Sequence, residues 1–196
     1  MKPYSQADKE VAKLNRYFIQ EFLRFQAIRL DELSVLRSAR AMYERMDKKA
    51  RSAFVRIAKE QDDDITIAEA LFLLDEYDPV TKYVYTHEVE RKRMRFAEAF
   101  IASKGNSSEV KTALRLWSNM IRQYSIAITD EALLLYYKKA GVEYVKWITE
   151  EDERRCTECA ARHNKIYQID KIPPKPHINC RCYFEPTKRD VVDISG

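Results

Sequence analysis

The chain has 196 residues, of which 45% are hydrophobic and 34% are charged, and its formal net charge is +4. This length allows one domain with a hydrophobic core, and the high charged fraction favours long amphipathic helices with charged outer faces. The three glycines lie far apart and exclude a Walker loop, a dinucleotide-binding fingerprint and a nucleophile elbow. No window of about 20 apolar residues predicts a membrane span. The start of the chain lacks the apolar core of a signal peptide, so we expect folding in the cytoplasm.

Two long helices are predicted in the N-terminal region, residues 1–80. Apolar residues at steps of three and four predict the first from Asp8 to about Leu30. A more polar pattern predicts the second, with interruptions, from about Asp31 to Lys59. The residues expected to be buried are Val11, Leu14, Phe18, Phe22 and Phe25 in the first helix, and Leu33, Leu36, Met42, Phe54 and Ile57 in the second.

A short third helix is predicted to begin at a capping box. Thr66 and Glu69 have the spacing at which each side chain satisfies the backbone N–H of the other, and the helix should end near Tyr77, before an Asp-Pro pair. An acidic run at residues 62–64 precedes this helix, where negative charge favours the helix dipole. We interpret the run as a solvated cap, because no neighbouring residues complete a cation site.

Three further helices are predicted between residues 81 and 141. The first ends near Ser103, Asn106 caps the second, and Thr129 or Asp130 begins the third, which ends at the glycine of YYKKAG. The residues expected to face inward are Tyr85, Val89, Phe96 and Phe100 in the first helix, Val110, Leu114, Trp117, Ile121 and Tyr124 in the second, and Leu133, Leu134 and Tyr137 in the third.

The pattern changes after residue 141. VEYVKWIT alternates and is rich in β-branched and aromatic residues, which predicts a strand, and KIYQI and RCYFE predict two more on either side of the proline-rich DKIPPKP. We therefore expect a mainly α fold of the α+β type, an elongated helical body with a small C-terminal β-rich module at residues 142–186. Residues 187–196 are predicted to form a flexible tail.

All four cysteines and one of the three histidines fall in two short clusters, RCTEC and PHINCRC. Cys156 and Cys159 form a C-x2-C pair, and His177 and Cys180 form an H-x2-C pair. Two such pairs separated by a loop are typical of a structural zinc site, so these four residues are the predicted ligands of Zn2+. Cys182 is the alternative fourth ligand, because alternate residues of a strand face the same side. Thiolate and imidazole ligands favour zinc over magnesium or calcium.

Two disulfides, or free core cysteines beside a surface histidine, are the alternatives to a metal site. A reducing compartment favours the metal. The cluster offers enough donors to close the zinc shell, whereas a catalytic zinc keeps an open position. The sequence also lacks the deaminase and the H-E-x-x-H patterns. We therefore expect no enzymatic activity.

The two cysteine clusters carry a family resemblance, together with the text around them. In AGVEYVKWITEEDERRCTECAARHNKIY and IPPKPHINCRCYFEP, a glycine leads to a strand ending in Trp and Thr, followed by Cys-x2-Cys, a turn, a proline-rich loop and a Cys-Arg-Cys ending. This order resembles the phage head morphogenesis family, the minor head proteins typified by the F protein of phage Mu. Asn164 stands at the family's turn glycine, and Ile178 stands where a proline follows the histidine. The resemblance is strongest from Gly141 to Pro186 and extends upstream to about Thr81, so residues 81–141 are the helical part of the domain.

The resemblance implies a minor head protein of the virion, present in the host cytoplasm during assembly. Such a protein acts in head morphogenesis, in portal-associated assembly, or in DNA packaging or ejection. The implied partners are portal, major capsid or scaffold proteins and packaged DNA, with no membrane and no small-molecule substrate. Relatives are structural and assembly proteins rather than enzymes.

Basic residues in the helix predicted at residues 81–103, and beside the first cysteine pair, are candidates for contact with DNA phosphates. An alternative interpretation is a solvated helix face on which nearby glutamates pair with the same side chains. Two other functions remain: a zinc-supported nuclease or toxin-like domain in which His163, Asn164 and His177 act on phosphodiesters, and a DNA-binding regulator with a zinc module. The candidate nucleic-acid-binding residues are Arg91, Lys92, Arg93, Arg95, Arg154 and Arg155.

Overall fold

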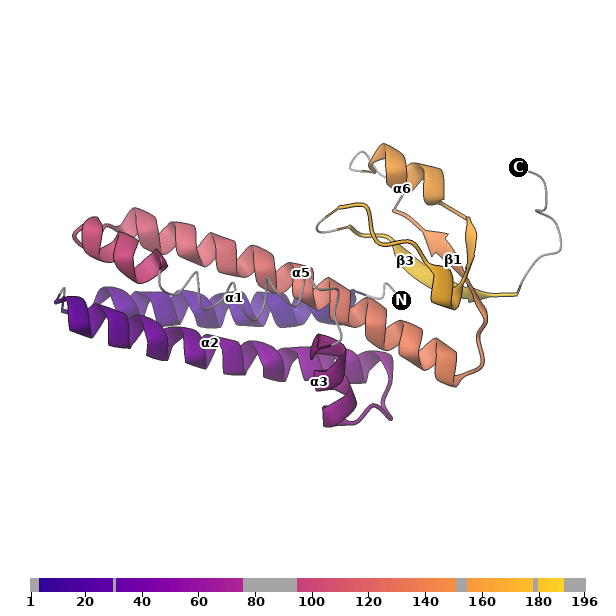
Figure 1. The fold of residues 1–196 in the computed structure, drawn as a ribbon, viewed down its shortest axis with the longest axis horizontal. Coiled ribbons are helices and arrows are strands. Elements are labelled where there is room, and N and C mark those ends of the chain that lie inside the picture. The colour runs from indigo at the N-terminus through magenta and orange to yellow at the C-terminus, as the bar shows by residue number, and fades with distance from the viewer. Residues whose placement is uncertain (1–3, 30, 76–94, 151–154, 178–179, 189–196) are drawn as a thin grey trace.

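The fold is known from a computed structural model, which describes residues 4–29, 31–75, 95–150, 155–177 and 180–188. Long helices run along one another to form an elongated body, and a small sheet lies at one end of it (Figure 1). The predicted mainly helical fold with a small C-terminal sheet is confirmed. No helix among these residues is both long enough and apolar enough to cross a lipid bilayer.

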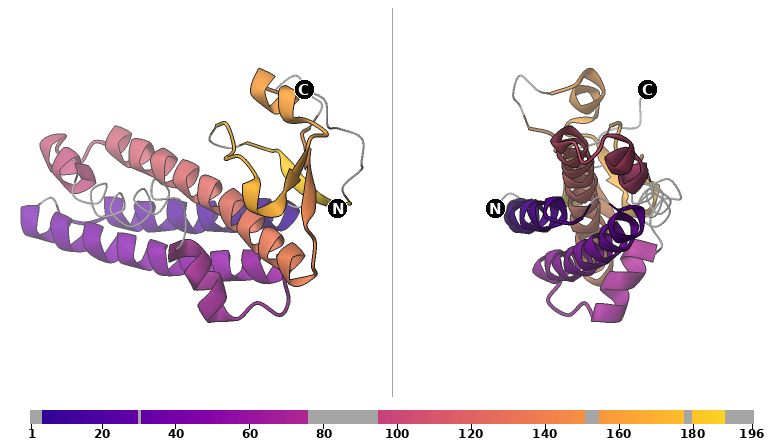
Figure 2. Two further views of the ribbon diagram at one scale, coloured as in Figure 1. Left: turned by 45° about the vertical axis from the view of Figure 1, so that its right-hand side comes forward. Right: turned by 90° about the vertical axis from the view of Figure 1, so that its left-hand side faces the viewer.

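Three helices form the body: α1 (Ser5–Gln26), α2 (Glu32–Gln61) and α5 (Ser107–Lys139). Each packs against the other two, and the short helix α3 (Ile67–Asp75) contacts α2 and α5. Viewed along the body, the three long helices form a triangular arrangement (Figure 2). Aromatic rings fill the space between them, and Phe18 of α1 meets Trp117 of α5 edge to face with ring centroids 5.7 Å apart.

Two buried glutamates fix the antiparallel register of α1 and α2. Glu10 and Glu21 are each 1% exposed. Arg56 donates to Glu10 at 2.7 Å, and Arg45 donates to Glu21 at the same distance. The two glutamates are eleven positions apart on α1, and the two arginines are eleven positions apart on α2. Eleven residues make about three helical turns, so both contacts lie on one face of each helix. A slip of either helix would separate each buried carboxylate from its arginine on α2 and leave it only the basic neighbour on its own helix.

The second helix differs from its prediction in two respects. It runs unbroken for 30 residues from the Asp31 cap, whose side chain accepts a hydrogen bond from the backbone N–H of Ser34. Leu33 is 56% exposed, so its predicted burial is wrong. The buried face is made largely of small or flexible residues, which weaken the apolar periodicity in the sequence: Val35, Ala39, Met42, Met46, Ala50, Ala53 and Ile57.

The capping box of α3 is confirmed. The carboxylate of Glu69 accepts from the Thr66 backbone N–H at 2.8 Å, and the Thr66 hydroxyl accepts from the Glu69 backbone N–H at 3.1 Å. Asp62 is not the solvated residue that we predicted, because it is 3% exposed and pairs with Lys139 at 2.9 Å. It joins the end of α2 to the end of α5.

The predicted break before residue 130 is wrong, because α5 is a single helix of 33 residues that Asn106 caps. Thr129 donates its hydroxyl hydrogen to the Ser125 carbonyl within the helix at 2.8 Å, and Asp130 bonds side chains from distant segments. Neither residue therefore caps a helix. Of the helix predicted at 81–103, residues 95–102 are helical and bury Phe96 and Phe100, whereas the predicted inward residues Tyr85 and Val89 lie outside the described residues.

The sheet has the order β2-β1-β3 with antiparallel pairing throughout. The central strand is β1 (Tyr144–Ile148), β2 is Ile166–Gln168 and β3 is Tyr183–Thr187. Val145 and Trp147 of β1 are fully buried, so the alternation predicted for this strand is confirmed. The helix α6 (Thr157–Arg162) and the one-turn 3-10 helix η1 (Ile169–Lys171) complete the module.

The glutamate pairs give a stability prediction. Burial raises the pKa of Glu10, but hydrogen bonds from Lys13 and Arg56 lower it by more, so the net pKa lies below its ordinary value. This contribution to stability is present above the ordinary pKa of 4.5 and is lost as the pH falls through the lower folded value. Glu10→Gln should therefore reduce the free energy of unfolding by about 1 kcal/mol at pH 7 and by less at pH 3.5, as measured by urea denaturation.

Glu44→Gln is the matched control, because its carboxylate pairs with Arg40 at the surface and is 57% exposed. That change should alter the free energy of unfolding little at either pH. A deficit for Glu10→Gln that is the same at pH 7 and pH 3.5 would show that the pair is not the source of the effect.

Candidate metal centre

The first half of the candidate metal centre is the start of α6. Cys156 is the N-cap residue of this helix, and its Sγ atom accepts a hydrogen bond from the backbone N–H of Cys159 at 3.3 Å. This single turn directs both sulfur atoms to one side. The sequence predicted the pairing of the two cysteines but not the helix, because six residues are too few to show a helical period.

The second half comes from the segment that leads into β3. The Sγ atom of Cys159 lies 3.5 Å from Nε2 of His177 and 3.6 Å from Sγ of Cys180. Cys159, Cys180 and Cys182 are at most 3% exposed, whereas His177 is at the surface. All four cysteines are free thiols in this structure.

These separations match the edges of a zinc tetrahedron. With Zn–S near 2.3 Å and Zn–N near 2.05 Å, tetrahedral ligands lie about 3.75 Å apart for two sulfurs and about 3.55 Å for sulfur and nitrogen. Two groups of three residues could each hold a metal ion, because the ligand atoms within each group all lie within 4.8 Å of one another. The first group is Cys156, Cys159 and His177, and the second is Cys159, Cys180 and Cys182. Cys159 belongs to both groups, so the four predicted ligands and the alternative Cys182 gather around its sulfur.

The thiols of Cys180 and Cys182 shift each other's pKa in opposite directions. The thiol of Cys180 donates to the sulfur of Cys182, which is the main reason why the pKa of Cys182 falls to about 5 and why that of Cys180 rises. Burial raises the pKa of Cys159 to about 12. Metal ligation requires thiolates, so a divalent cation bound here would replace protons that these sulfurs now hold.

His163 has a structural role in this module. Its Nδ1 atom accepts a hydrogen bond from the backbone N–H of Thr149 at 3.1 Å, and it belongs to neither group of donor atoms. Asn164 has a φ of +63°, the left-handed conformation expected where the family has glycine. The backbone N–H of Asn164 donates to the Trp147 carbonyl at 2.8 Å. Both residues thus close the turn between α6 and β2, an arrangement that gives no support to the nuclease alternative.

The predicted DNA-contacting residues do not form one observed patch. Arg91, Lys92, Arg93 and Arg154 lie outside the described residues. Arg95 and Arg155 are exposed. The helical segment 95–102 lies at the end of the body away from α6 (Figure 1), so these two arginines are far apart.

A buried polar network joins the module to the body. The Tyr4 hydroxyl lies 2.6 Å from both Asp130 Oδ1 and the Cys182 carbonyl oxygen, and it accepts from Lys175 Nζ at 2.5 Å. Lys175 also pairs with Asp130 at 2.5 Å. Burial raises the pKa of Asp130 despite this lysine. The sequence predicted none of these contacts, because Tyr4 and Cys182 are 178 positions apart and no local pattern marks them.

The fold and the cysteine cluster together define a helical protein with a small module that can bind a metal. The family model described as Phage Mu protein F like protein matches residues 85–185, which is more than half of the chain. The chain therefore belongs to this family of phage head proteins, and the resemblance inferred from the cysteine clusters is confirmed. Comparisons with curated proteins and with solved structures gave no match.

The matched range contains α5, β1, β2, the first three residues of β3 and both cysteine clusters. It excludes α1, α2 and α3, although α1 and α2 share one hydrophobic cluster with α5. A structural role in the phage head, in contact with other head components, agrees with membership of this family.

The network predicts the effect of removing one hydroxyl group. Tyr4→Phe should lower the free energy of unfolding by about 1–2 kcal/mol, because it removes the one donor that Asp130 and the Cys182 carbonyl share and an acceptor for Lys175. Urea denaturation at pH 7 measures this loss. Tyr136→Phe is the control, since Tyr136 is 46% exposed, and equal effects of the two changes would contradict a special role for Tyr4.

Proposed function

We propose that this chain is a minor head protein of the virion in which Cys156, Cys159, His177 and Cys180 hold a structural zinc ion. The observation that carries the metal proposal is the position of the Cys159 sulfur, at tetrahedral distances from both His177 and Cys180. Cys182 is the alternative fourth ligand, since its sulfur belongs to the second group of donors around Cys159.

Zinc bound here would cross-link α6 to the segment that leads into β3. The residues between them are proline-rich and expose much of their surface, so they contribute little apolar burial of their own. Arg162 helps to hold them, because its guanidinium donates to the Pro174 carbonyl at 2.6 Å and lies over the Trp147 ring. Metal binding would therefore add folding energy to the whole module.

Elemental analysis tests the ligand set. The purified protein should contain about one zinc per chain, Cys159→Ser should abolish it, and Cys180→Ser should remove most of it. Cys182→Ser should retain the metal, because that residue is the neighbour of the proposed set. The reverse result for Cys180 and Cys182 would identify Cys182 as the ligand. A chain that is metal-free and equally stable with and without a chelator would refute the zinc proposal.

The proposed role in the head follows from family membership and from the shape of the molecule. We propose that the zinc module, residues 142–186, docks on a portal, major capsid or scaffold protein during head morphogenesis. Residues 81–141 would be the helical part of the same domain, residues 1–80 an N-terminal helical region, and residues 187–196 a flexible tail. Packaged DNA is a further proposed partner, with Arg95 and Arg155 among the candidate contacts during packaging or ejection.

Mass spectrometry of purified phage heads tests this role. A few copies per head are expected, and the Cys159→Ser protein should be depleted from heads, because the docking module would lack its metal cross-link. Glu158→Gln, an exposed change in the same helix, serves as the control and should leave the copy number unchanged. Absence of the protein from DNA-filled heads would contradict the proposal.

A further inference from the structure

A cleft of about 720 Å³ lies between α5 and the segment of the module that runs from Ile169 to His177. One wall is the face of α5 from Gln123 to Lys138, a length of about 22 Å at 1.5 Å per residue. The other wall is the loop that follows η1, which the ribbon shows passing above the second half of α5 (Figures 1 and 2). We call this space the α5 cleft.

Two ion pairs hold the walls of the α5 cleft together. Lys175 of the loop pairs with Asp130 of α5 at 2.5 Å, and Lys138 of α5 pairs with Asp170 of η1 at 2.6 Å. All four residues line the cleft. The opposite charges within each pair neutralise each other. The two pairs connect the same two walls at two positions along α5, so the cleft is already formed without a partner.

Glu131 is the acidic residue of the cleft lining that takes part in neither ion pair. It lines the cleft beside Asp130, and among the described residues no hydrogen bond or ion pair to its carboxylate is found. Glu131 is exposed to solvent, so a partner can reach its carboxylate, and desolvation together with the charge of Asp130 raises its pKa. The side chains around it are largely apolar, including Ile126, Leu134, Ile172, Pro173 and Pro174.

We propose that the α5 cleft binds an extended segment of a partner protein that carries one lysine or arginine between apolar residues. The basic side chain would pair with Glu131, and the apolar neighbours would pack on the proline wall. Charge complementarity selects a basic group, because Glu131 gives the lining a net charge of −1 when His177 is neutral. The length of the α5 wall matches six or seven extended residues at about 3.3 Å each.

This inference deepens the proposed function by naming the chemistry of a protein partner. It rests on the proposed zinc module only because His177 and Cys180 lie at one edge of the cleft. Zinc content is therefore measured on every variant, so that loss of the module can be told apart from loss of the binding site.

The test uses the full-length, zinc-loaded chain and a synthetic array of seven-residue peptides. Each peptide has a central arginine or lysine flanked by leucine, isoleucine, valine or proline, and matched sets carry glutamine or glutamate at the centre. Fluorescence anisotropy then gives the Kd of the best binder for the parent chain and for Glu131→Gln. The variant should bind about three- to fivefold more weakly, because an ion pair to an exposed carboxylate is lost.

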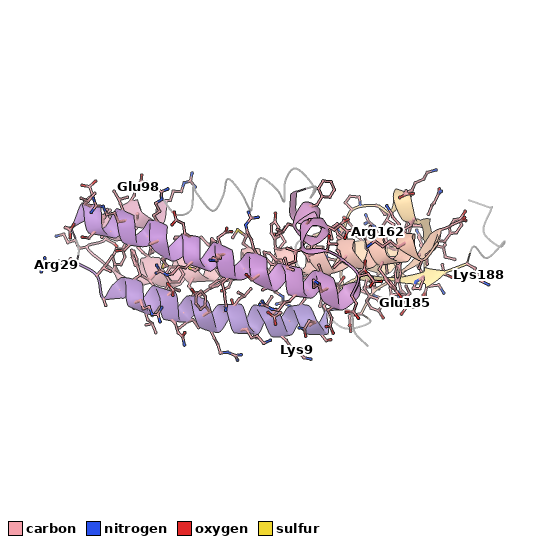
Figure 3. All side chains as sticks on the ribbon, turned by 90° about the horizontal axis from the view of Figure 1, so that it is seen from below. Lys9, Arg29, Glu98, Arg162, Glu185 and Lys188 are labelled. Carbon is pink, nitrogen blue, oxygen red and sulfur yellow. The ribbon has the colours of Figure 1, made fainter. Side chains whose placement is uncertain are left out.

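Two further variants make the test specific. Ala127→Phe should also weaken binding, since it fills the floor of the cleft without changing its charge. Glu98→Gln should leave the Kd unchanged, because Glu98 is exposed at the end of the body opposite to the module residue Arg162 (Figure 3). Equal binding of the basic and the glutamine-centred peptides, or an unchanged Kd for Glu131→Gln, would overturn the inference. So would a parent chain with one zinc that binds no peptide, although the proposed zinc module would then stand.

Discussion

The relative position of body and module depends on one buried carboxylate. Asp130 is 7% exposed and lies within α5, where Ile128 and Ala132 are also buried. A buried carboxylate is costly unless charged and hydrogen-bonding partners surround it. Lys175 and Tyr4 supply those partners from the module and from the start of α1, and Tyr4 also reaches the Cys182 carbonyl. Three segments that are remote in sequence therefore meet at one point, next to the candidate metal centre.

The body provides the rigid support that this arrangement needs. The antiparallel register of α1 and α2 is held by Glu10 and Glu21, each with an arginine from α2. Edge-to-face rings such as Phe18 and Trp117 fill the space toward α5. The ion pairs specify the register and the aromatic rings fill the core, so together they hold Tyr4 and Asp130 in place.

The candidate metal centre and the α5 cleft share the loop between η1 and β3. His177 lies beside the sulfur of Cys159 and also lines the cleft, and Lys175 both lines the cleft and closes the network with Asp130. A metal held by His177 would therefore stiffen one wall of the cleft. This link would connect the proposed zinc site to the proposed recognition of a partner in the head.

Features that depend on residues close together in the chain could be predicted from the sequence. Helical periodicity, the capping box of Thr66 and Glu69, the buried alternation of β1 and the close approach of Cys156 and Cys159 were predictable, because a few adjacent residues carry each pattern. Only the tertiary structure decided the rest. The same Asp130 that reads as a helix cap in the sequence is an interior residue of α5, since its partners lie 45 and 126 positions away. Likewise, the sulfur of Cys159 became the centre of the cluster only when α6 and β3 came together, because local spacing cannot specify distances across a fold.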